Sequence, residues 1–366
     1  MKISFPGYKI IDGYILRKFL GTYLFSIALI TVILVVFDYA ERVDSFTESH
    51  APWSAIIFDY YLNYIPEFIT QFSGLFTFIS VIFFTSKMAY QTEIIAILSG
   101  GVSFRRLMWP YFLGAFAIMM LSLSLNLWII PPSQVNCVNF KRAYFRKYKN
   151  EQYDRHIYRQ IAPGEYVYVR GFDNDNSAEY FTLERYEGTE IKQTLEASGI
   201  TIIPEEKRWK AQRYIIRTID DSGKETFTQL RDLDTVVNLD VRELGRVAET
   251  VKTMKIGELN DFLRQQRQKG SDSINVIEVA QHTRFSYPMA TFILTLIGVS
   301  LSSRKVRGGT GLHIGIGITL CFSYIMFNRV FEEFAKSGAL PVWLAVWMPN
   351  IIFAIIAVYL YRKAPK

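Results

Sequence analysis

The apolar residues of this 366-residue chain are gathered into six long runs that contain no Asp, Glu, Lys or Arg. They are Phe19–Phe37, Phe68–Ser86, Leu107–Phe140, Phe285–Ser303, Gly308–Asn328 and Ser337–Tyr361. A helix needs about 20 apolar residues to cross a bilayer, so each run predicts a membrane-spanning helix. The alternative is the buried helices of a large soluble protein, but six such runs in one chain favour the membrane. The third run is too long for one span, and Pro131-Pro132 predicts where its helix leaves the membrane.

A polar segment between the third and fourth runs has the alternating pattern of β-strands. In Glu165–Arg170 the valines and tyrosines point to opposite faces, and Tyr180–Tyr186 alternates in the same way. Further strands are predicted over Ile191–Ala197, Gly199–Ile203, Trp209–Ile219, Thr226–Leu230 and Thr235–Leu239. This rhythm predicts a sandwich, jelly roll or barrel, followed by an amphipathic helix over Ile256–Gln268.

These patterns together predict an α-helical membrane protein with six transmembrane helices. An all-β domain, in the form of a sandwich, jelly roll or barrel, is inserted between helices 3 and 4. The expected domains are residues 1–132, with a short cytoplasmic helix at 87–101, then 133–283 and 284–366. The inserted segment carries 24 basic and 24 acidic residues, as expected for a folded, water-exposed domain.

Charge predicts the orientation of the spans. The segments that should share one side of the membrane hold Lys2, Lys9, Arg17, Lys18, Lys87, Arg105, Arg106, Arg304, Lys305, Arg307, Arg362, Lys363 and Lys366, against only Asp12 and Glu93. Because basic loops stay in the cytoplasm, both termini should be cytoplasmic and the inserted domain periplasmic, in a multi-pass bacterial inner-membrane protein. The net charge of +7 is therefore a topology signal and does not indicate nucleic-acid binding.

Catalytic and cofactor motifs are missing from the sequence. It has no phosphate-binding loop, since Gly308–Gly315 lacks the required Lys, and its four histidines have no metal-ligand spacing. Cys137 and Cys321 are far apart and imply no disulfide framework. We expect no catalytic residue, no metal and no bound cofactor, and any ATP would be used by a partner chain.

The segment between the second and third runs predicts a short apolar helix with a single carboxylate, Glu93. Ser86 or Thr92 would cap it, and Gly100-Gly101 would end it. Such a helix suits docking into a groove on a partner protein. An interfacial helix lying on the bilayer fits the pattern equally well.

Ionisable residues cluster at the predicted outer ends of two spans. Asp38, Glu41 and Arg42 follow the first run, and Arg329 follows the fifth. Either arginine is a candidate contact for an anionic lipid head group, although solvated helix ends are the simpler reading of each residue alone.

Gly311 and Gly315 form a small-xxx-small pair at the head of the fifth run. This spacing indicates a close helix–helix contact or a moving gate, with ordinary bundle packing as the commoner cause.

Four stretches resemble the lipopolysaccharide-export permeases of the LptF/LptG type. They are Ile11–Leu20, Thr92–Ser103, Arg284–Pro288 followed by Arg307–Gly311, and Leu340-Pro341 with Trp347–Asn350. Their order around a β-rich domain carries the resemblance over nearly the whole chain.

The resemblance implies a paralogous permease subunit, a dimeric cytoplasmic ATPase and periplasmic lipopolysaccharide-bridge proteins as partners. Lipopolysaccharide would enter a cavity between the permeases through gaps lined by the first and fifth spans. ATP-driven closure would pass it to the jellyroll domains. Glu93 matches the carboxylate of the family's coupling helix, which would pair with a basic residue of the ATPase; Thr92, Ser99, Gly100 and Gly101 belong to the same segment. Relatives carry a basic residue near the outer end of the first span, where this chain has Asp38, Glu41 and Arg42.

Two other functions fit the six spans less well. A secondary lipid transporter predicts ionisable residues near mid-bilayer and matching halves, whereas the middles of these runs are uncharged. A membrane tether for a periplasmic β module would need one span only. A membrane enzyme ranks last, because no site is recognisable.

Overall fold

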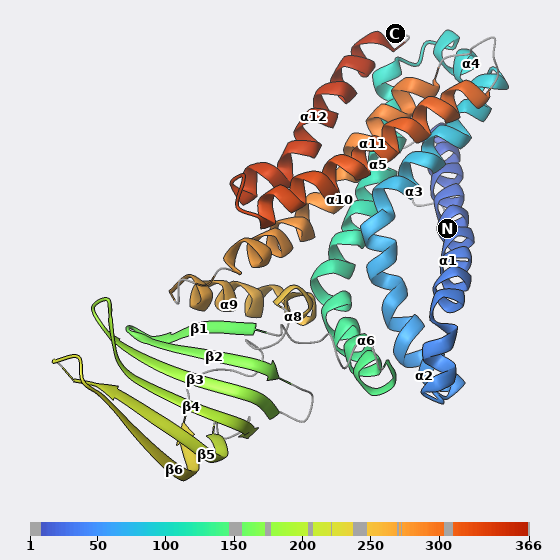
Figure 1. Cartoon of the computed structure of the whole chain (residues 1–366). Helices are drawn as coiled ribbons and strands as arrows, with labels where there is room; N and C mark the ends of the chain where they lie inside the picture. Colours follow the sequence, from blue (N-terminus) through green and yellow to red (C-terminus); the bar gives the residue numbers. More distant parts are fainter. Residues whose placement is uncertain are drawn as a thin grey trace. The chain divides into compact units, whose positions relative to one another are not determined.

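The computed structural model describes residues 9–145, 156–172, 177–203, 208–220, 222–236, 247–268, 271, 273–303 and 310–364 (Figure 1). The helices are α1 Ile10–Glu48, α2 Trp53–Ala55, α3 Leu62–Tyr90, α4 Glu93–Ser99, α5 Phe104–Ser124, α6 Ile130–Tyr144, α8 Val247–Thr253, α9 Ile256–Gln268, α10 Ile274–Ser302, α11 Thr310–Lys336 and α12 Val342–Lys363, with π-helical turns η1 Ile56–Tyr61 and η2 Leu125–Ile129. The strands are β1 His156–Ala162, β2 Glu165–Phe172, β3 Ser177–Glu187, β4 Glu190–Ile203, β5 Arg208–Ile219 and β6 Glu225–Val236.

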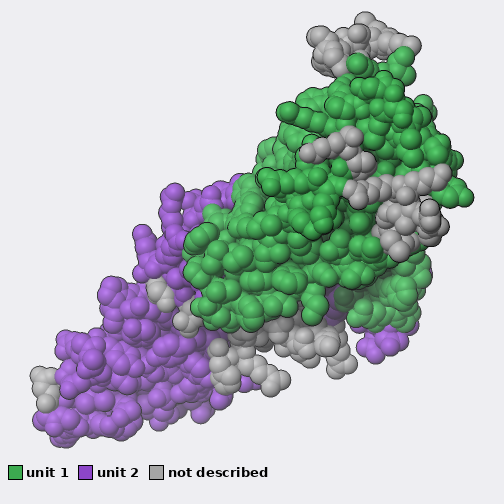
Figure 2. Space-filling view, turned by 90° about the horizontal axis from the view of Figure 1, so that it is seen from above, with its two compact units in different colours: residues 1–43, 56–134, 278–366 green, residues 44–55, 135–277 purple. Residues whose placement is uncertain are grey.

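The chain forms two compact units, coloured green and purple in Figure 2. The helical unit contains residues 1–43, 56–134 and 278–366, and the β unit contains residues 44–55 and 135–277. Residues at the end of α1 belong to the β unit, where Phe46 packs on Phe140 and Phe145 at ring distances of 6.2 and 5.4 Å.

Long apolar helices make up the helical unit, which confirms a helical membrane protein. Five helical stretches are long and apolar enough to cross a bilayer: Ile10–Glu48, Trp53–Tyr90, Phe104–Tyr144, Ile274–Ser302 and Val342–Lys363. Helix α11 lies over the fifth apolar run. Residues 304–309, which hold several of the predicted cytoplasmic charges, lie outside the described residues.

The Pro131-Pro132 pair lies within a continuous helix, and its position as the exit from the membrane stays a prediction. Helix α6 begins at Ile130 and continues through both prolines to Tyr144. The preceding turn, Leu125–Ile129, is π-helical. A proline lacks an N–H and clashes with the carbonyl four residues earlier, so a widened turn at that place accommodates the pair without breaking the helix.

Packing of aromatic rings joins α1 to α3 and α5. The ring of Phe19 lies 5.7 Å from Phe84 and 6.2 Å from Tyr111, and Phe84 stacks on Tyr111 at 5.4 Å. All three rings are buried in one apolar cluster. Gly114 of α5 allows this approach, because a Cβ added there would lie 2.4 Å from the Phe19 ring.

The β unit holds one six-stranded antiparallel sheet, in which each strand pairs with its neighbours in the order β1-β2-β3-β4-β5-β6. This confirms an antiparallel β domain inserted between the helices, and its strand order is an up-and-down meander. Strand β1 was not anticipated. The segments predicted separately on either side of Ser198 form the single strand β4, and Thr226–Leu230 is part of β6. Thr235 and Val236, the first two residues of the predicted strand Thr235–Leu239, also belong to β6, and residues 237–239 lie outside the described residues.

A row of left-handed residues crosses this sheet. Gly171 of β2, Gly199 of β4 and Asp232 of β6 have φ of 65°, 66° and 58°. The hydrogen-bonded pairs on either side of these residues align them across the sheet; Ser198 pairs with Arg213, for example, and Ala211 pairs with Leu233. The three residues therefore lie on one line. We call this line the sheet corner.

The sheet corner shifts the alternation of side chains by one residue. In β4, Ala197 is buried before the corner and Ile200 and Ile202 are buried after it. A left-handed residue in a strand bends it and re-aims the side chains that follow. Because the shift occurs across the sheet, apolar residues from both sides of the corner share one core. The rings of Trp209 and Phe181 pack there in a tilted arrangement, with centroids 4.8 Å apart.

We predict that Gly114→Ala lowers the stability of the helical unit by about 1–3 kcal/mol, because the new methyl group must displace the buried Phe19 ring. Thermal unfolding of the purified protein in detergent measures the effect. Gly21→Ala is the matched control, since an added Cβ there meets nothing within 4 Å. Equal melting temperatures for the two variants would contradict the packing at Gly114.

Candidate functional site

Helix α4 is a short helix between two turns, of which the sequence predicted only the one at Gly100-Gly101; the predicted cap is wrong, because Ser86 lies inside α3. Thr92 precedes it with a left-handed φ of 62° and makes no side-chain cap. At the other end Gly101 has φ 83°, its N–H bonds to Leu98 O at 3.1 Å, and Val102 N bonds to Ile97 O at 3.4 Å. This is the Schellman ending that glycine favours. Gly100 and Gly101 therefore turn the chain sharply before α5 begins.

The two sides of α4 differ in burial. Ile94 is 1% exposed and packs in the cluster that contains Phe19, while Ile97 and Leu98 are partly buried against the same cluster. On the other side Ile95 is 47% exposed, and Ala96 and Ser99 are also exposed. One side therefore anchors the helix to the helical unit, and the other presents a small apolar surface.

Glu93 is bound by residues of α1. Its carboxylate accepts a hydrogen bond from the Tyr14 hydroxyl at 2.9 Å, and both of its oxygens lie 3.3 Å from Lys18 Nζ. Lys18 Nζ also lies 4.2 Å from the centre of the Tyr14 ring. Sequence reasoning assigned Glu93 to a partner protein and missed both α1 residues, although their spacing of four places them on one helix face.

A second ion pair joins α1 to the start of α5. Arg106 binds Asp12 with two hydrogen bonds, of 2.7 and 2.5 Å. Asp12, 2% exposed, also accepts the Lys9 backbone N–H at 2.7 Å. The carboxylate thus caps the first turn of α1 and forms a bidentate pair, the geometry in which arginine binds carboxylates most strongly.

The acidic cluster after the first apolar run is internally paired. Arg42 Nε donates to Asp38 Oδ1 at 2.9 Å, and the buried Tyr60 hydroxyl donates to the same oxygen at 3.3 Å. Asp38 is 7% exposed, whereas Glu41 is exposed. Asp38 therefore fixes the end of α1 against η1, and Arg42 keeps a side chain that is one-third exposed.

Gly311 and Gly315 do not contact another helix among the described residues. A Cβ added at either position would meet nothing within 4 Å. Gly317 is the close-packed glycine, since its added Cβ would lie 2.2 Å from Ile82 Cδ1 of α3. Phe322 and Met326, which are 63% and 68% exposed, lie on the other face of α11, the one that carries Gly311 and Gly315.

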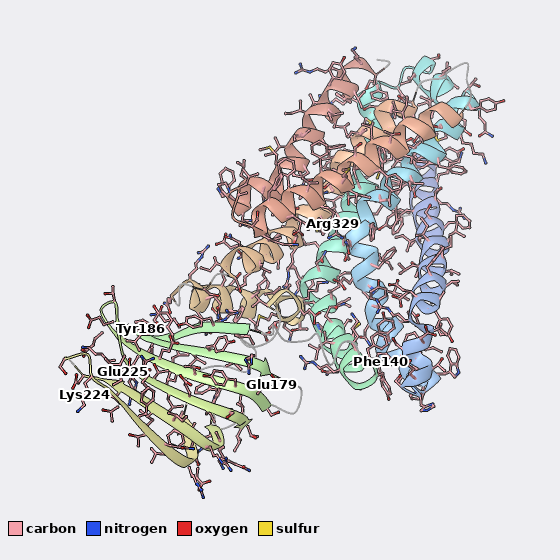
Figure 3. The ribbon with its side chains drawn as sticks, in the orientation of Figure 1. Phe140, Glu179, Tyr186, Lys224, Glu225 and Arg329 are labelled. Carbon is pink, nitrogen blue, oxygen red and sulfur yellow. The ribbon has the colours of Figure 1, made fainter. Side chains whose placement is uncertain are left out.

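Arg329 borders a small cavity of about 70 Å³ in the helical unit, and Figure 3 labels this residue on α11. The cavity is lined by Gln71, Phe72, Gly74, Leu75, Tyr287, Ala290, Tyr324, Ile325, Asn328 and Arg329. The guanidinium lies 3.7 Å from Glu332, whose carboxylate also accepts a hydrogen bond from the Tyr287 hydroxyl. Arg329 is 54% exposed, so its charge is available beside a partly polar cavity.

Asn350 ties three helices together. Its side chain accepts a hydrogen bond from Tyr324 of α11 at 2.8 Å and donates one to the backbone oxygen of Ser286 in α10 at 3.0 Å. A polar side chain that is 4% exposed in an apolar bundle is stable only with such partners. The prolines at 288 and 349 were visible in the sequence, but this hydrogen-bond centre was not anticipated.

Tyrosines cover the face of the sheet opposite its apolar core. Tyr158 donates to Glu184 at 2.6 Å and Tyr186, labelled in Figure 3, donates to the same carboxylate at 3.0 Å. Desolvation and the Glu184 carboxylate raise the pKa of both hydroxyls above the ordinary value. These hydroxyls therefore remain protonated donors throughout the physiological pH range.

No group of His, Cys, Asp and Glu that fits a metal ion occurs within the part of the chain that the structure describes.

We predict that Asn350→Leu destabilises the protein by about 1–3 kcal/mol, because the Tyr324 hydroxyl loses its buried acceptor. Combining it with Tyr324→Phe should cost less than the sum of the two single changes, since both remove one interaction. Thermal unfolding in detergent measures each variant, and Tyr359→Phe at a 55% exposed position is the control. Full additivity would contradict a direct bond.

The comparisons with known proteins agree with this architecture. No curated protein sequence matches the chain. The profile of the family described as lipopolysaccharide export system permease LptF/LptG matches residues 13–363, which include every helix from α3 to α11 and the whole sheet. The chain therefore belongs to the LptF/LptG family of lipopolysaccharide export system permeases.

Proposed function

We propose that this chain is a permease subunit of an ATP-driven exporter that extracts lipopolysaccharide from the inner membrane and passes it to a periplasmic bridge. The observation that carries the proposal is α4, a helix anchored by Ile94 that leaves Ile95 exposed at one end of the helical unit. The sequence has no phosphate-binding loop, so the ATPase is a separate, dimeric chain that docks on this exposed side.

Extraction of a lipid with several acyl chains requires an external energy source. Each methylene group buried in the bilayer is worth about 0.8 kcal/mol, so the barrier grows quickly with the number of chains. Hydrolysis of ATP by the docked partner supplies that energy, and this chain supplies the path and the binding surfaces.

The distribution of charge supports an orientation with α4 and both termini in the cytoplasm. The segment from α3 to α5 carries Lys87, Arg105 and Arg106, and Arg362 and Lys363 end α12. By the positive-inside rule these residues face the cytoplasm, and the β unit lies in the periplasm.

Exposed apolar faces on α1 and α11 support pairing with a second permease. Only 11% of the most apolar stretch of α1 is buried within this chain, and Phe25 and Phe37 are 68% and 72% exposed. With Phe322 and Met326 of α11, these side chains offer surfaces to a paralogous subunit and to the acyl chains between the two. Arg42 and Arg329 are the candidate contacts for phosphate groups of the lipid, and Gly311 and Gly315 leave α11 free to approach a neighbour.

The apolar face of the sheet is the proposed receiver of the acyl chains. Val167, Phe181, Leu195 and Trp209 form its core, and the sheet corner keeps that face continuous. Toward the β5–β6 hairpin, Leu230 is 39% exposed, so the apolar face is open to a ligand there.

Ile95→Arg is expected to abolish co-purification of an ATPase from the native cells, because a charge replaces the exposed apolar residue of α4. Val236→Arg in β6, at a position that is 67% exposed, is the matched control and should retain the ATPase. A wild-type chain that purifies without any ATPase in mild detergent would overturn the proposal and favour a secondary transporter or a tether.

A photo-crosslinking amino acid at Ile216 should label lipopolysaccharide in cells, whereas the same probe at Ile215 should not. The two positions are neighbours on β5, but Ile216 pairs with Leu195 on the apolar face, and Ile215 pairs with Glu196 on the tyrosine face. Labelling at Ile215 alone, detected by gel shift and lipid staining, would contradict acyl-chain binding to the apolar face.

A further inference from the structure

Helix α1 is packed tightly in its first turns and again toward its other end, where Asp38 and Phe46 are buried. Ile15, Phe19 and Tyr23 are at most 3% exposed, and the Tyr23 hydroxyl lies 3.0 Å from Ser73 Oγ of α3. Beyond Tyr23 the helix exposes Leu24, Phe25, Leu29, Val32, Val36 and Phe37. The position of the exposed stretch therefore depends on how both ends are held, and the contacts of the first turns lie beside α4.

Two ion pairs hold the first turns of α1, one at the start of α4 and the other just after its end. Glu93, the first residue of α4, binds Tyr14 and Lys18, and Arg106, close after α4, binds Asp12. Tyr14 and Lys18 are four residues apart on one face of α1, so their two contacts with Glu93 restrain rotation of α1 as well as its distance from α4.

Helix α4 has few other attachments. It is seven residues long, and Ile94 is its one buried residue. Glycines end it, and a left-handed residue precedes it. A force applied to α4 therefore reaches the rest of the helical unit through the packing of Ile94, Ile97 and Leu98 and through the polar contacts of Glu93.

We propose that Tyr14, Lys18 and Glu93 form a positioning link through which α4 sets the orientation of α1. The role of this link rests on the proposed function, because an ATPase that docks on the exposed side of α4 would move α1 together with α4. Glu93 then acts within the chain, and the exposed Ile95 side contacts the partner.

The distance between α1 and α4 tests the link in the full-length chain, without a partner. Spin labels are placed at Gly21→Cys on α1 and Ser99→Cys on α4, both exposed, after the buried Cys137 and Cys321 are changed to Ser. The protein is reconstituted in nanodiscs of phosphatidylethanolamine and phosphatidylglycerol, and double electron–electron resonance gives the distribution of distances.

We expect one narrow distribution with the link intact. Lys18→Glu places two carboxylates together and should widen the distribution about twofold, because like charges at this range repel. The double variant Lys18→Glu/Glu93→Lys restores opposite charges and should restore the narrow distribution. Lys336→Glu is the matched control. It reverses the charge of Lys336 in the Lys336–Glu333 pair on α11 and should leave the width of the distance distribution unchanged.

A distribution as narrow in Lys18→Glu as in the wild type would overturn the link, and so would failure of the charge exchange to restore it. If Lys18→Glu does not fold, Lys18→Met combined with Tyr14→Phe removes both contacts without repulsion, and the same widening is expected. Failure of the ATPase to co-purify with the wild-type chain would instead overturn the proposed function and leave this distance measurement unchanged.

Discussion

The lack of water inside a bilayer is the constraint on which the helical unit depends, because backbone polar groups there must find partners within the protein. The π-helical turn before Pro131-Pro132 keeps the chain helical where two N–H groups are missing. Hydroxyl side chains return to their own helix, as Thr70 does to the carbonyl of Pro66 at 3.2 Å. Asn350 satisfies its amide across two other helices. The apolar runs can therefore carry prolines and polar residues and remain continuous spans.

The same constraint explains why charges gather at the ends of the spans. Asp12, Lys18, Glu93 and Arg106 lie in the first turns of α1 and around α4, while Asp38 and Arg42 lie toward the other end of α1. Each carboxylate has a cation or hydroxyl within hydrogen-bond distance, as buried charge requires. Helix α1 is consequently held near both ends, and most of its large apolar side chains between them are exposed, which supports the proposed contact with a lipid or a neighbouring subunit.

The β unit follows a different rule, since water covers one face of its sheet and an apolar core the other. If the long strands stayed flat, the two halves of the apolar face could not pack against each other. Left-handed residues at Gly171, Gly199 and Asp232 bend the strands along one line instead, and both arms contribute to one core. The binding surface proposed for acyl chains is thus a property of the whole row and not of any one strand.

The sequence by itself determined the elements that depend on local patterns. Runs of apolar residues specified the spans, alternation specified most strands, and Gly100-Gly101 specified where the short helix α4 ends. The ATPase, the lipid and the residues that bind them stay predictions. Arg42 and Arg329 are the predicted contacts for the lipid, and α4, which begins at Glu93, is the predicted contact for the ATPase.

Only the tertiary structure decided which side chains meet. Glu93 pairs with Lys18 across 75 positions, Gly317 rather than Gly311 or Gly315 packs against α3, and the row of left-handed residues is a corner only because ladder pairing aligns it. None of these follows from sequence spacing, because contacts between distant segments depend on how helices rotate and how strands register when they pack, and those choices are made by the fit of many side chains at once.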